Sequence, residues 1–162
     1  MSVAADILTR AKARGTMIAT AESCTGGMVA AALTDTPGSS AMFDRGFVTY
    51  TNAAKSEMLG VLAATLDAYG AVSEEVAAQM ATGALSRSHA QLAVSITGIA
   101  GPGGSEFKPE GRVCFGLAAG GSGGQVTTET IEYGPLGRDK VRRAACDHAL
   151  HLLHGALSAY GS

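Results

Sequence analysis

Two kinds of hydrophobic pattern alternate along the chain. Apolar residues recur with the spacing of an amphipathic helix in five segments: Val3–Ala13, Gly26–Leu33, Ala53–Leu59, Glu74–Ser88 and Arg138–Ser158. Short apolar runs between them predict five strands: Met17–Ala21, Gly46–Thr51, Leu92–Thr97, Arg112–Ala118 and Val126–Tyr133. Helices and strands therefore alternate early in the chain, whereas the last two strands follow one another directly.

The order of these elements indicates the fold class. Alternation of strands and helices is typical of an α/β sheet, and consecutive strands are typical of an antiparallel pair. The glycine-rich segment GGSGG (Gly120–Gly124) fits a hairpin turn between the last two strands. We therefore predict a mixed sheet with helices on both faces. No linker, repeat or low-complexity tract divides the chain, so residues 1–162 are interpreted as a single domain.

Composition narrows the class of protein. Hydrophobic residues make up 46% of the chain and charged residues 16%, which excludes a disordered chain. A net charge of -2 and only 5% aromatic residues give no reason to expect nucleic acid. The longest apolar runs are too short for a membrane span, and the N-terminus lacks a signal-peptide pattern. We expect a soluble cytoplasmic protein that binds neither nucleic acid nor membrane.

Three polar segments rich in glycine or hydroxyl groups follow the first three predicted strands. They are AESCTGG (residues 21–27), YTNAAK (residues 50–55) and TGIAGPGGSEFKPEG (residues 97–111). In open α/β sheets, ligands bind beyond the carboxyl ends of parallel strands. If the three strands run parallel, these segments should meet at one edge of the sheet.

The first segment places a hydroxyl, a thiol and two glycines at a helix start. Free N–H groups there can bind an anion or a developing oxyanion, and Gly26 and Gly27 would let a ligand approach closely. The alternative is that Ser23 or Thr25 only caps the helix. Capping does not explain two glycines in a first turn, where they cost helix stability. Cys24 is an alternative nucleophile, because a thiol at a helix N-terminus is activated.

Lys55 occupies an unfavourable position for an ammonium group. It lies in the first turn of a predicted helix with Asn52 as the expected N-cap, at the positive end of the helix dipole. Partial burial would lower its pKa further and make a neutral amine available as a general base. The alternative is a solvated surface lysine. Tyr50 fits a core position and a substrate-facing phenol equally well.

The third segment is a glycine-rich turn followed by Lys108. Backbone N–H groups and one cation can wrap a phosphate in such a turn, although the spacing matches neither a Walker loop nor a dinucleotide fingerprint. The alternative is a flexible surface loop.

The histidines and the remaining cysteines do not indicate a metal site. Three histidines, His148, His151 and His154, are spaced by three, which does not form a tight ligand face on a helix. Cys114 and Cys146 fit core positions of a strand and a helix. With Cys24 they make an odd number of widely spaced thiols, as expected of reduced cysteines.

The chain resembles the CinA C-terminal-domain family, whose active members are nicotinamide-nucleotide amidases. The matching segments are AESCTGG, GFVTYTNAAKSEMLGV, GAVSEEVAAQMATGA, SITGIAGPGG, KPEGRV and GRDKVRRAACDHALHLL. They occur in family order and cover nearly the whole chain, and AESCTGG together with TGIAGP is quite specific. The resemblance implies a three-layer α/β/α fold with a mixed, mostly parallel five-stranded sheet. It also implies hydrolysis of nicotinamide mononucleotide to nicotinate mononucleotide and ammonia, in pyridine-nucleotide salvage, with no cofactor.

The resemblance also implies roles for individual residues. Ser23 matches the family's nucleophile and Lys55 its base, which together would form a Ser–Lys dyad. An amide carbonyl is a poor electrophile, so both an activated hydroxyl and oxyanion donors are needed. We expect the 24–27 turn to hold the oxyanion, the Gly101–Gly104 loop to hold the nucleotide, and Lys108 or Arg138 to bind its phosphate. The expected oxyanion and substrate-binding residues are Glu22, Cys24, Thr25, Gly26, Gly27, Tyr50, Asn52, Thr97, Gly98, Gly101, Gly103, Gly104, Lys108 and Arg138.

The chain departs from the family pattern in three respects. The loop between Gly101 and Lys108 is one residue shorter, and Glu110 stands where an apolar residue is commoner, beside the expected phosphate site. Both bear on the nucleotide contacts and leave the expected dyad untouched. The molybdopterin-binding-like domain of longer members is absent, so the stand-alone form is expected. Two alternative functions stay open: a nucleotide-binding or regulatory module without catalysis, and an amidohydrolase that uses Cys24. Assembly into a homo-oligomer is also possible from the sequence.

Overall fold

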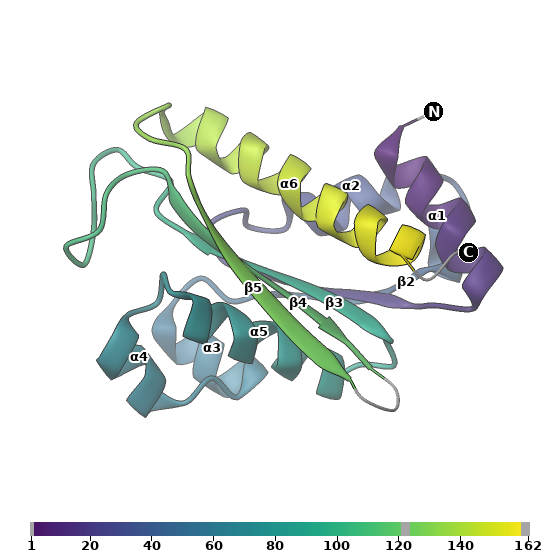
Figure 1. The fold of residues 1–162 in the computed structure, drawn as a ribbon, viewed down its shortest axis with the longest axis horizontal. Helices are drawn as coiled ribbons and strands as arrows, with labels where there is room; N and C mark the ends of the chain where they lie inside the picture. The colour runs from purple at the N-terminus through teal and green to yellow at the C-terminus, as the bar shows by residue number, and fades with distance from the viewer. Residues whose placement is uncertain (1, 121–123, 160–162) are drawn as a thin grey trace.

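A five-stranded sheet forms the centre of the computed structural model, which describes residues 2–120 and 124–159 (Figure 1). Its strands lie in the order β2-β1-β3-β4-β5. Their bounds are β1 Ile18–Glu22, β2 Phe43–Val48, β3 Leu92–Gly98, β4 Arg112–Ala119 and β5 Gln125–Glu132. β1 pairs in parallel with β2 and β3, whereas β4 pairs antiparallel with both β3 and β5. β4 therefore opposes the direction of the other strands of this sheet, which confirms the predicted mixed, mostly parallel arrangement.

Helices cover both faces of the sheet, as Figure 1 shows. One face carries α1 (Val3–Arg14), α2 (Met28–Thr34) and α6 (Arg138–Ala159). The other face carries α3 (Asn52–Leu59), α4 (Ala63–Tyr69) and α5 (Glu74–Ser86). A 3-10 turn, η1 (Ser39–Ala41), leads into β2. The three-layer α/β/α prediction is therefore confirmed.

The residues of β1 show how one strand supplies two apolar layers. Successive side chains of a strand point to opposite faces of the sheet. Ile18 belongs to the core cluster that includes α1 and α6, whereas Ala19 and Ala21 belong to the cluster that includes α5. Small residues also allow α5 to approach the sheet closely, because a Cβ added at Gly116 would lie 2.5 Å from the Ala77 carbonyl oxygen.

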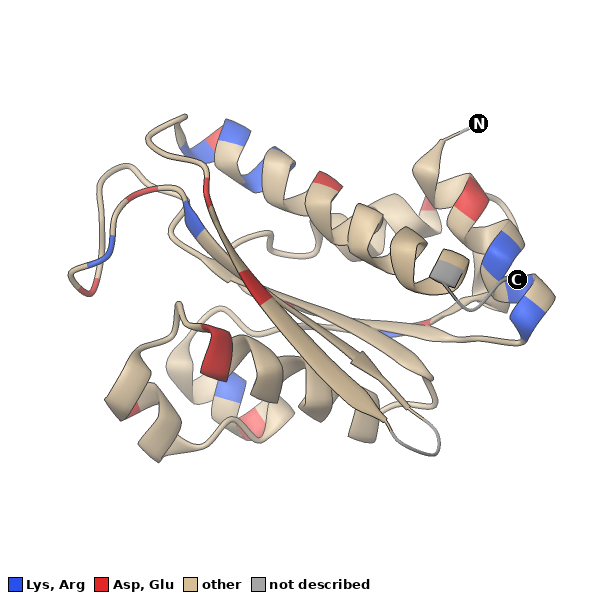
Figure 2. Ribbon diagram, in the orientation of Figure 1, with Lys and Arg blue, Asp and Glu red and all other residues tan. Residues whose placement is uncertain are grey.

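α6 combines a buried face with a charged one. Val141, Ala145, Ala149 and Leu153 recur at helical spacing, and all four are fully buried. Figure 2 shows basic residues over the first turns of this helix, close to the sheet edge that the loops occupy. None of the helices in the described ranges is long and apolar enough to cross a membrane.

Several boundaries differ from the prediction. The second strand, predicted as Gly46–Thr51, covers Phe43–Val48; most of its residues are partly or fully exposed, so its apolar pattern is weak. The helix α4 was not predicted, because seven residues carry little periodic signal. Asn52 is not the cap of α3, since the hydroxyl of Thr51 accepts the Ala54 N–H. β4 and β5 pair as the hairpin prediction requires, and residues 121–123 of the predicted turn lie outside the described residues.

Candidate active site

The three polar segments meet at one edge of the sheet. β1, β2 and β3 are parallel, so the connections that follow them open on the same side. A cavity of about 340 Å³ lies there, and the start of α6 contributes to its wall. The predicted residues that line it are Ser23, Cys24, Tyr50, Asn52, Lys55, Thr97, Gly98, Gly101, Gly103, Gly104 and Arg138. The lining residues that the sequence did not single out are Ala71, Val72, Ile99, Ala100, Pro102, Ser105 and Glu106.

Ser23 and Lys55 are in direct contact on the cavity wall. Ser23 follows β1, and its N–H donates to the Ile96 carbonyl of β3 at 2.9 Å, which fixes its backbone to the sheet. Lys55 comes from α3, and its Nζ lies 3.0 Å from the Ser23 Oγ. Both are buried, with Ser23 7% and Lys55 2% exposed. A hydroxyl and an amine 32 residues apart in sequence are thereby held at hydrogen-bond distance.

Burial makes the neutral form of the Lys55 amine easier to reach than it is in water. Burial lowers the pKa of Lys55 from its ordinary value of 10.5, and Cys24 and Glu106 oppose this shift. The Nζ also lies 3.1 Å from the Thr49 carbonyl oxygen and 3.5 Å from that of Tyr50. A neutral amine has two N–H donors and one lone pair. The two carbonyls can accept the donors, which leaves the lone pair for the hydroxyl proton of Ser23.

Glu22 lies beneath the site, outside the cavity lining, and its side chain is fully buried. One carboxylate oxygen, Oε1, accepts the Thr25 hydroxyl at 2.6 Å and the Val29 N–H at 2.9 Å. The other, Oε2, accepts the Ala30 N–H at 3.0 Å. Glu22 therefore binds the first turn of α2, where a negative charge is favourable. It supports the turn that carries Ser23 and does not reach the cavity.

Replacing Glu22 with alanine should lower the free energy of unfolding by about 3 kcal/mol. The substitution leaves three donors, two of them buried, without their acceptor and opens space beneath the turn. Glu22→Gln should cost less, because the amide keeps the volume and one accepting oxygen. Chemical denaturation checks this, with Glu57→Ala on the exposed surface of α3 as the matched control. A Glu22→Ala protein as stable as the control would contradict this support of α2.

The two glycines of the first segment form the turn and lie outside the cavity lining. Gly26 has φ +59° and Gly27 has φ +107°, a region that side chains other than glycine's rarely adopt. Neither lines the cavity, and nor does Thr25. The Gly26 N–H donates to the Ser23 carbonyl at 3.0 Å. The N-cap of α2 is Gly27, without a side-chain cap, so the alternative of a capping Ser23 or Thr25 is wrong.

Cys24 lies at the cavity but in surroundings that disfavour a thiolate. Its side chain is 5% exposed, and burial raises the pKa of its thiol to about 12. Its carbonyl oxygen accepts a 2.9 Å hydrogen bond from the Nε of Arg142. Arg142 is not among the residues predicted for the site. Its position one helical turn after Arg138 is the signal that could have found it.

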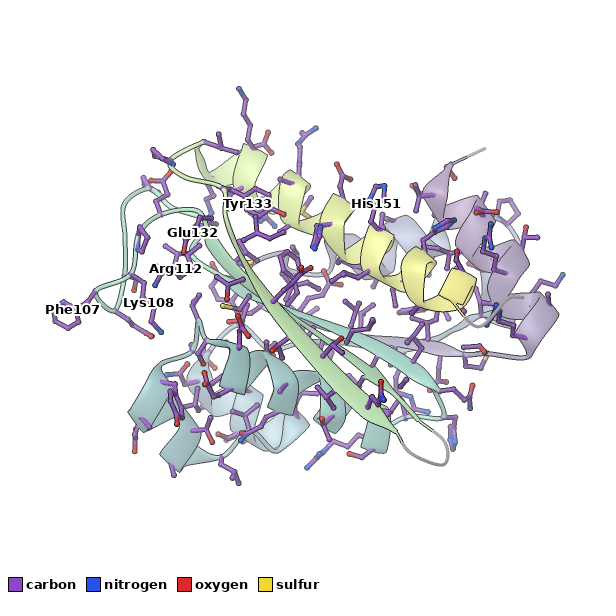
Figure 3. All side chains as sticks on the ribbon, viewed as in Figure 1. Phe107, Lys108, Arg112, Glu132, Tyr133 and His151 are labelled. Atoms are coloured by element: carbon purple, nitrogen blue, oxygen red, sulfur yellow. The ribbon has the colours of Figure 1, made fainter. Side chains whose placement is uncertain are left out.

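Lys108 does not line the cavity, contrary to the expected phosphate contact. Its Nζ donates to the carbonyls of Tyr69 and Val72, each at 2.6 Å. Figure 3 shows Lys108 on the long loop beside α4, with Phe107 pointing away from the molecule. Glu106 of the same loop accepts the Ala71 N–H at 3.1 Å. Both charged side chains tie the loop to the α4–α5 connection.

Arg138 connects two of the three segments at the mouth of the cavity. Its Nη1 donates to the Gly101 carbonyl at 2.7 Å, and its Nη2 donates to the Tyr50 hydroxyl at 2.6 Å. Tyr50 is 58% exposed, so of its two interpretations the structure favours the phenol facing the cavity. Thr97 is buried deeper in the cavity wall, and its hydroxyl donates to the Ala71 carbonyl at 2.9 Å. Arg138 is exposed and provides a cation beside the glycine-rich loop.

Two histidines of α6 contact carboxylate side chains. His148 contacts Glu129, and His154 contacts Asp6. Within residues 2–120 and 124–159, no group of three or more histidine, cysteine, aspartate or glutamate side chains is arranged to hold a metal ion.

Several known proteins are similar to this chain in sequence or in structure. The chain is 54% identical over 143 residues to the nicotinamide-nucleotide amidohydrolase PncC of Escherichia coli, covering 88% of this chain and 85% of that protein. It is 61% identical over 117 residues to a CinA-like protein of Chlorobium phaeobacteroides, but that match covers only 28% of the longer relative. Among solved structures, the competence/damage inducible protein CihA of Agrobacterium tumefaciens superposes with a TM-score of 0.90 at 52% identity, covering 96% of this chain and 93% of that one.

Residues 1–157 of the chain match the family model of the CinA C-terminal domain. This range includes both Ser23 and Lys55 and all of the strands. The chain therefore belongs to the CinA C-terminal domain family.

Proposed function

We propose that this protein hydrolyses the carboxamide of nicotinamide mononucleotide, giving nicotinate mononucleotide and ammonia. The observation that carries the proposal is the 3.0 Å contact between the Ser23 hydroxyl and the buried Lys55 amine, inside a cavity of ligand size. The name of the Escherichia coli relative, which matches over most of both chains, supports the substrate. The role in pyridine-nucleotide salvage follows from this reaction and belongs to the same proposal.

In the first half of the reaction, Ser23 is acylated. The neutral Lys55 amine takes the hydroxyl proton as the Ser23 Oγ attacks the carboxamide carbon. The negative charge that develops on the carboxamide oxygen needs N–H donors, and the N–H of the residue after a nucleophile is well placed for this. That residue is Cys24, which lines the cavity. The C–N bond then breaks, and Lys55 returns its proton to the departing ammonia.

In the second half, water releases the acid. Lys55, neutral again, takes a proton from a water molecule as the water attacks the ester on Ser23. The ester bond breaks, nicotinate mononucleotide leaves, and the proton returns to the Ser23 oxygen. One amide and one water are thereby converted into one acid and one ammonia, and the pair of side chains is regenerated.

The nucleotide part of the substrate lies along the glycine-rich loop in this proposal. Gly101, Gly103 and Gly104 line the cavity, and Arg138 stands beside them. A guanidinium is suited to bind phosphate because its N–H groups form a planar fork. Arg138 is therefore the proposed phosphate ligand. Lys108 is not, because it does not line the cavity and its Nζ donates to the carbonyls of Tyr69 and Val72.

Ser23, and not Cys24, is the proposed nucleophile. A thiol whose pKa is near 12 is protonated at neutral pH, and the thiolate is the reactive form. The amine of Lys55 contacts the hydroxyl of Ser23 directly.

Purified protein should release ammonia from nicotinamide mononucleotide, with one nicotinate mononucleotide formed per ammonia. A coupled ammonia assay with chromatography of the nucleotides measures both. Cys24→Ala should retain activity within about 10-fold, because only its backbone N–H takes part. Loss of activity in Cys24→Ala with a fully active Ser23→Ala would instead support a thiol enzyme. Binding of the nucleotide by wild type without ammonia would support the non-catalytic module.

A further inference from the structure

Glu110 joins two segments that lie on either side of the cavity mouth. Its Oε1 accepts the Gly103 N–H at 2.7 Å, and its Oε2 accepts the Gly137 N–H at 3.2 Å. Gly103 belongs to the glycine-rich wall of the cavity, whereas Gly137 immediately precedes Arg138 and α6. Both carboxylate oxygens of one half-buried side chain are thus engaged by backbone donors from different segments.

A second set of contacts closes the connection between these segments. A Cβ added at Gly101 would lie 2.5 Å from the Glu110 Cδ, so the carboxyl group packs against the Gly101 backbone. The Gly101 carbonyl in turn accepts the guanidinium of Arg138. Glu110 therefore contacts both the glycine-rich loop and the residue before Arg138, and Arg138 itself contacts the same loop. These contacts form a closed ring.

We propose that Glu110 is a positioning residue that fixes Arg138 and the Gly101–Gly104 loop in the orientation that receives the substrate's phosphate. This inference rests on the proposed function. Glu110 does not line the cavity, so it acts through Arg138 and the loop and not by contact with substrate. The arrangement also explains how an acidic residue is accommodated here, because its charge is taken up by two N–H groups.

Charge repulsion is the competing effect of a carboxylate near a phosphate. Removal of the charge would then strengthen binding of the nucleotide, whereas loss of positioning would weaken it. Glu110→Gln separates the two effects, because it removes the charge and keeps the shape. Its amide oxygen can still accept one of the two N–H groups, but its NH₂ group cannot accept the other.

The test compares a substrate that has the phosphate with one that lacks it. In Glu110→Ala, the KM and the Kd for nicotinamide mononucleotide should rise about 10-fold, which corresponds to the loss of a charge-assisted hydrogen bond. The rise in Glu110→Gln should be smaller. The kcat for the mononucleotide should stay near wild type in both variants, and the kcat/KM for nicotinamide riboside should fall less than that for the mononucleotide. Glu57→Ala, an exposed glutamate outside the cavity, serves as the matched control.

A double-mutant cycle and amide exchange complete the test. In an Arg138→Ala background, Glu110→Ala should add little further loss, because the two residues act together. Hydrogen exchange of the Gly103 and Gly137 amides should be faster in both Glu110 variants. Tighter binding by Glu110→Gln, an equal loss for the riboside and the mononucleotide, or additive losses would overturn the positioning role.

Failure of the inference can be told apart from failure of the proposed function. A wild-type protein that releases no ammonia from nicotinamide mononucleotide rejects the amidase. Exchange of the two glycine amides is independent of activity, so unchanged protection in the variants overturns the role of Glu110 in either case. A fully active wild type with an unchanged KM in Glu110→Ala rejects this inference and retains the amidase.

Discussion

Lys55→Ala should lower the kcat for hydrolysis of nicotinamide mononucleotide by about 10³-fold or more, within the range that a general acid–base group contributes. The amine of Lys55 is the one basic group in hydrogen-bond contact with the Ser23 hydroxyl among the described residues. Without it, no side chain takes the hydroxyl proton or returns a proton to ammonia. The KM should change much less, because Lys55 acts on the reacting atoms. Steady-state ammonia release measures both constants.

The pH dependence of the wild-type enzyme gives the matching control. Only the neutral amine accepts a proton, so kcat should rise with pH as Lys55 deprotonates. Burial lowers the pKa of Lys55, and the midpoint of this rise should therefore lie below 10.5. The limb should vanish in Lys55→Ala. Lys55→Arg should also be inactive, because a guanidinium stays protonated at any working pH. A Lys55→Ala enzyme that retained both its rate and this limb would exclude Lys55 as the base.

Ser23→Ala should lower kcat by about 10⁴-fold or more, since it removes the nucleophile itself. Substrate should still bind, because the glycine-rich loop and Arg138 are untouched. The double variant Ser23→Ala/Lys55→Ala should be no less active than Ser23→Ala alone, since residues that act as a unit are strongly non-additive. Ammonia release under saturating substrate measures the rates, and calorimetry measures binding. Multiplicative losses in the double variant would mean that the two side chains act independently.

Much of the architecture could be predicted because it depends on local pattern. Apolar periodicity separates helices from buried strands such as β1 and β3, and consecutive strands indicate the antiparallel pair β4–β5. The exposed edge strand β2 and the short helix α4 were misplaced or missed, because neither carries a strong apolar pattern. The three segments at the site followed from one rule, that parallel strands present their carboxyl ends at the same edge.

The details of the site depend on contacts between distant residues. Arg142 binds the Cys24 carbonyl across 118 positions of sequence. Its helical spacing from Arg138 places it on the same side of the helix, but it does not indicate this distant partner. A glycine-rich loop followed by a lysine predicts a phosphate contact, but it does not determine where the lysine side chain points. Lys108 binds the carbonyls of Tyr69 and Val72 instead. Gly26 and Gly27 were likewise assigned to ligand approach, whereas their positive φ angles serve the turn itself.

Trapping with hydroxylamine tests most directly whether Ser23 forms an acyl intermediate. Hydroxylamine competes with water for an ester on Ser23, and it would convert nicotinamide mononucleotide into the corresponding hydroxamate. We predict that wild type forms the hydroxamate at the expense of nicotinate mononucleotide, in proportion to the hydroxylamine concentration, and that Ser23→Ala forms none. Undiminished formation of nicotinate mononucleotide and ammonia, with no hydroxamate at any hydroxylamine concentration, would contradict nucleophilic catalysis by Ser23.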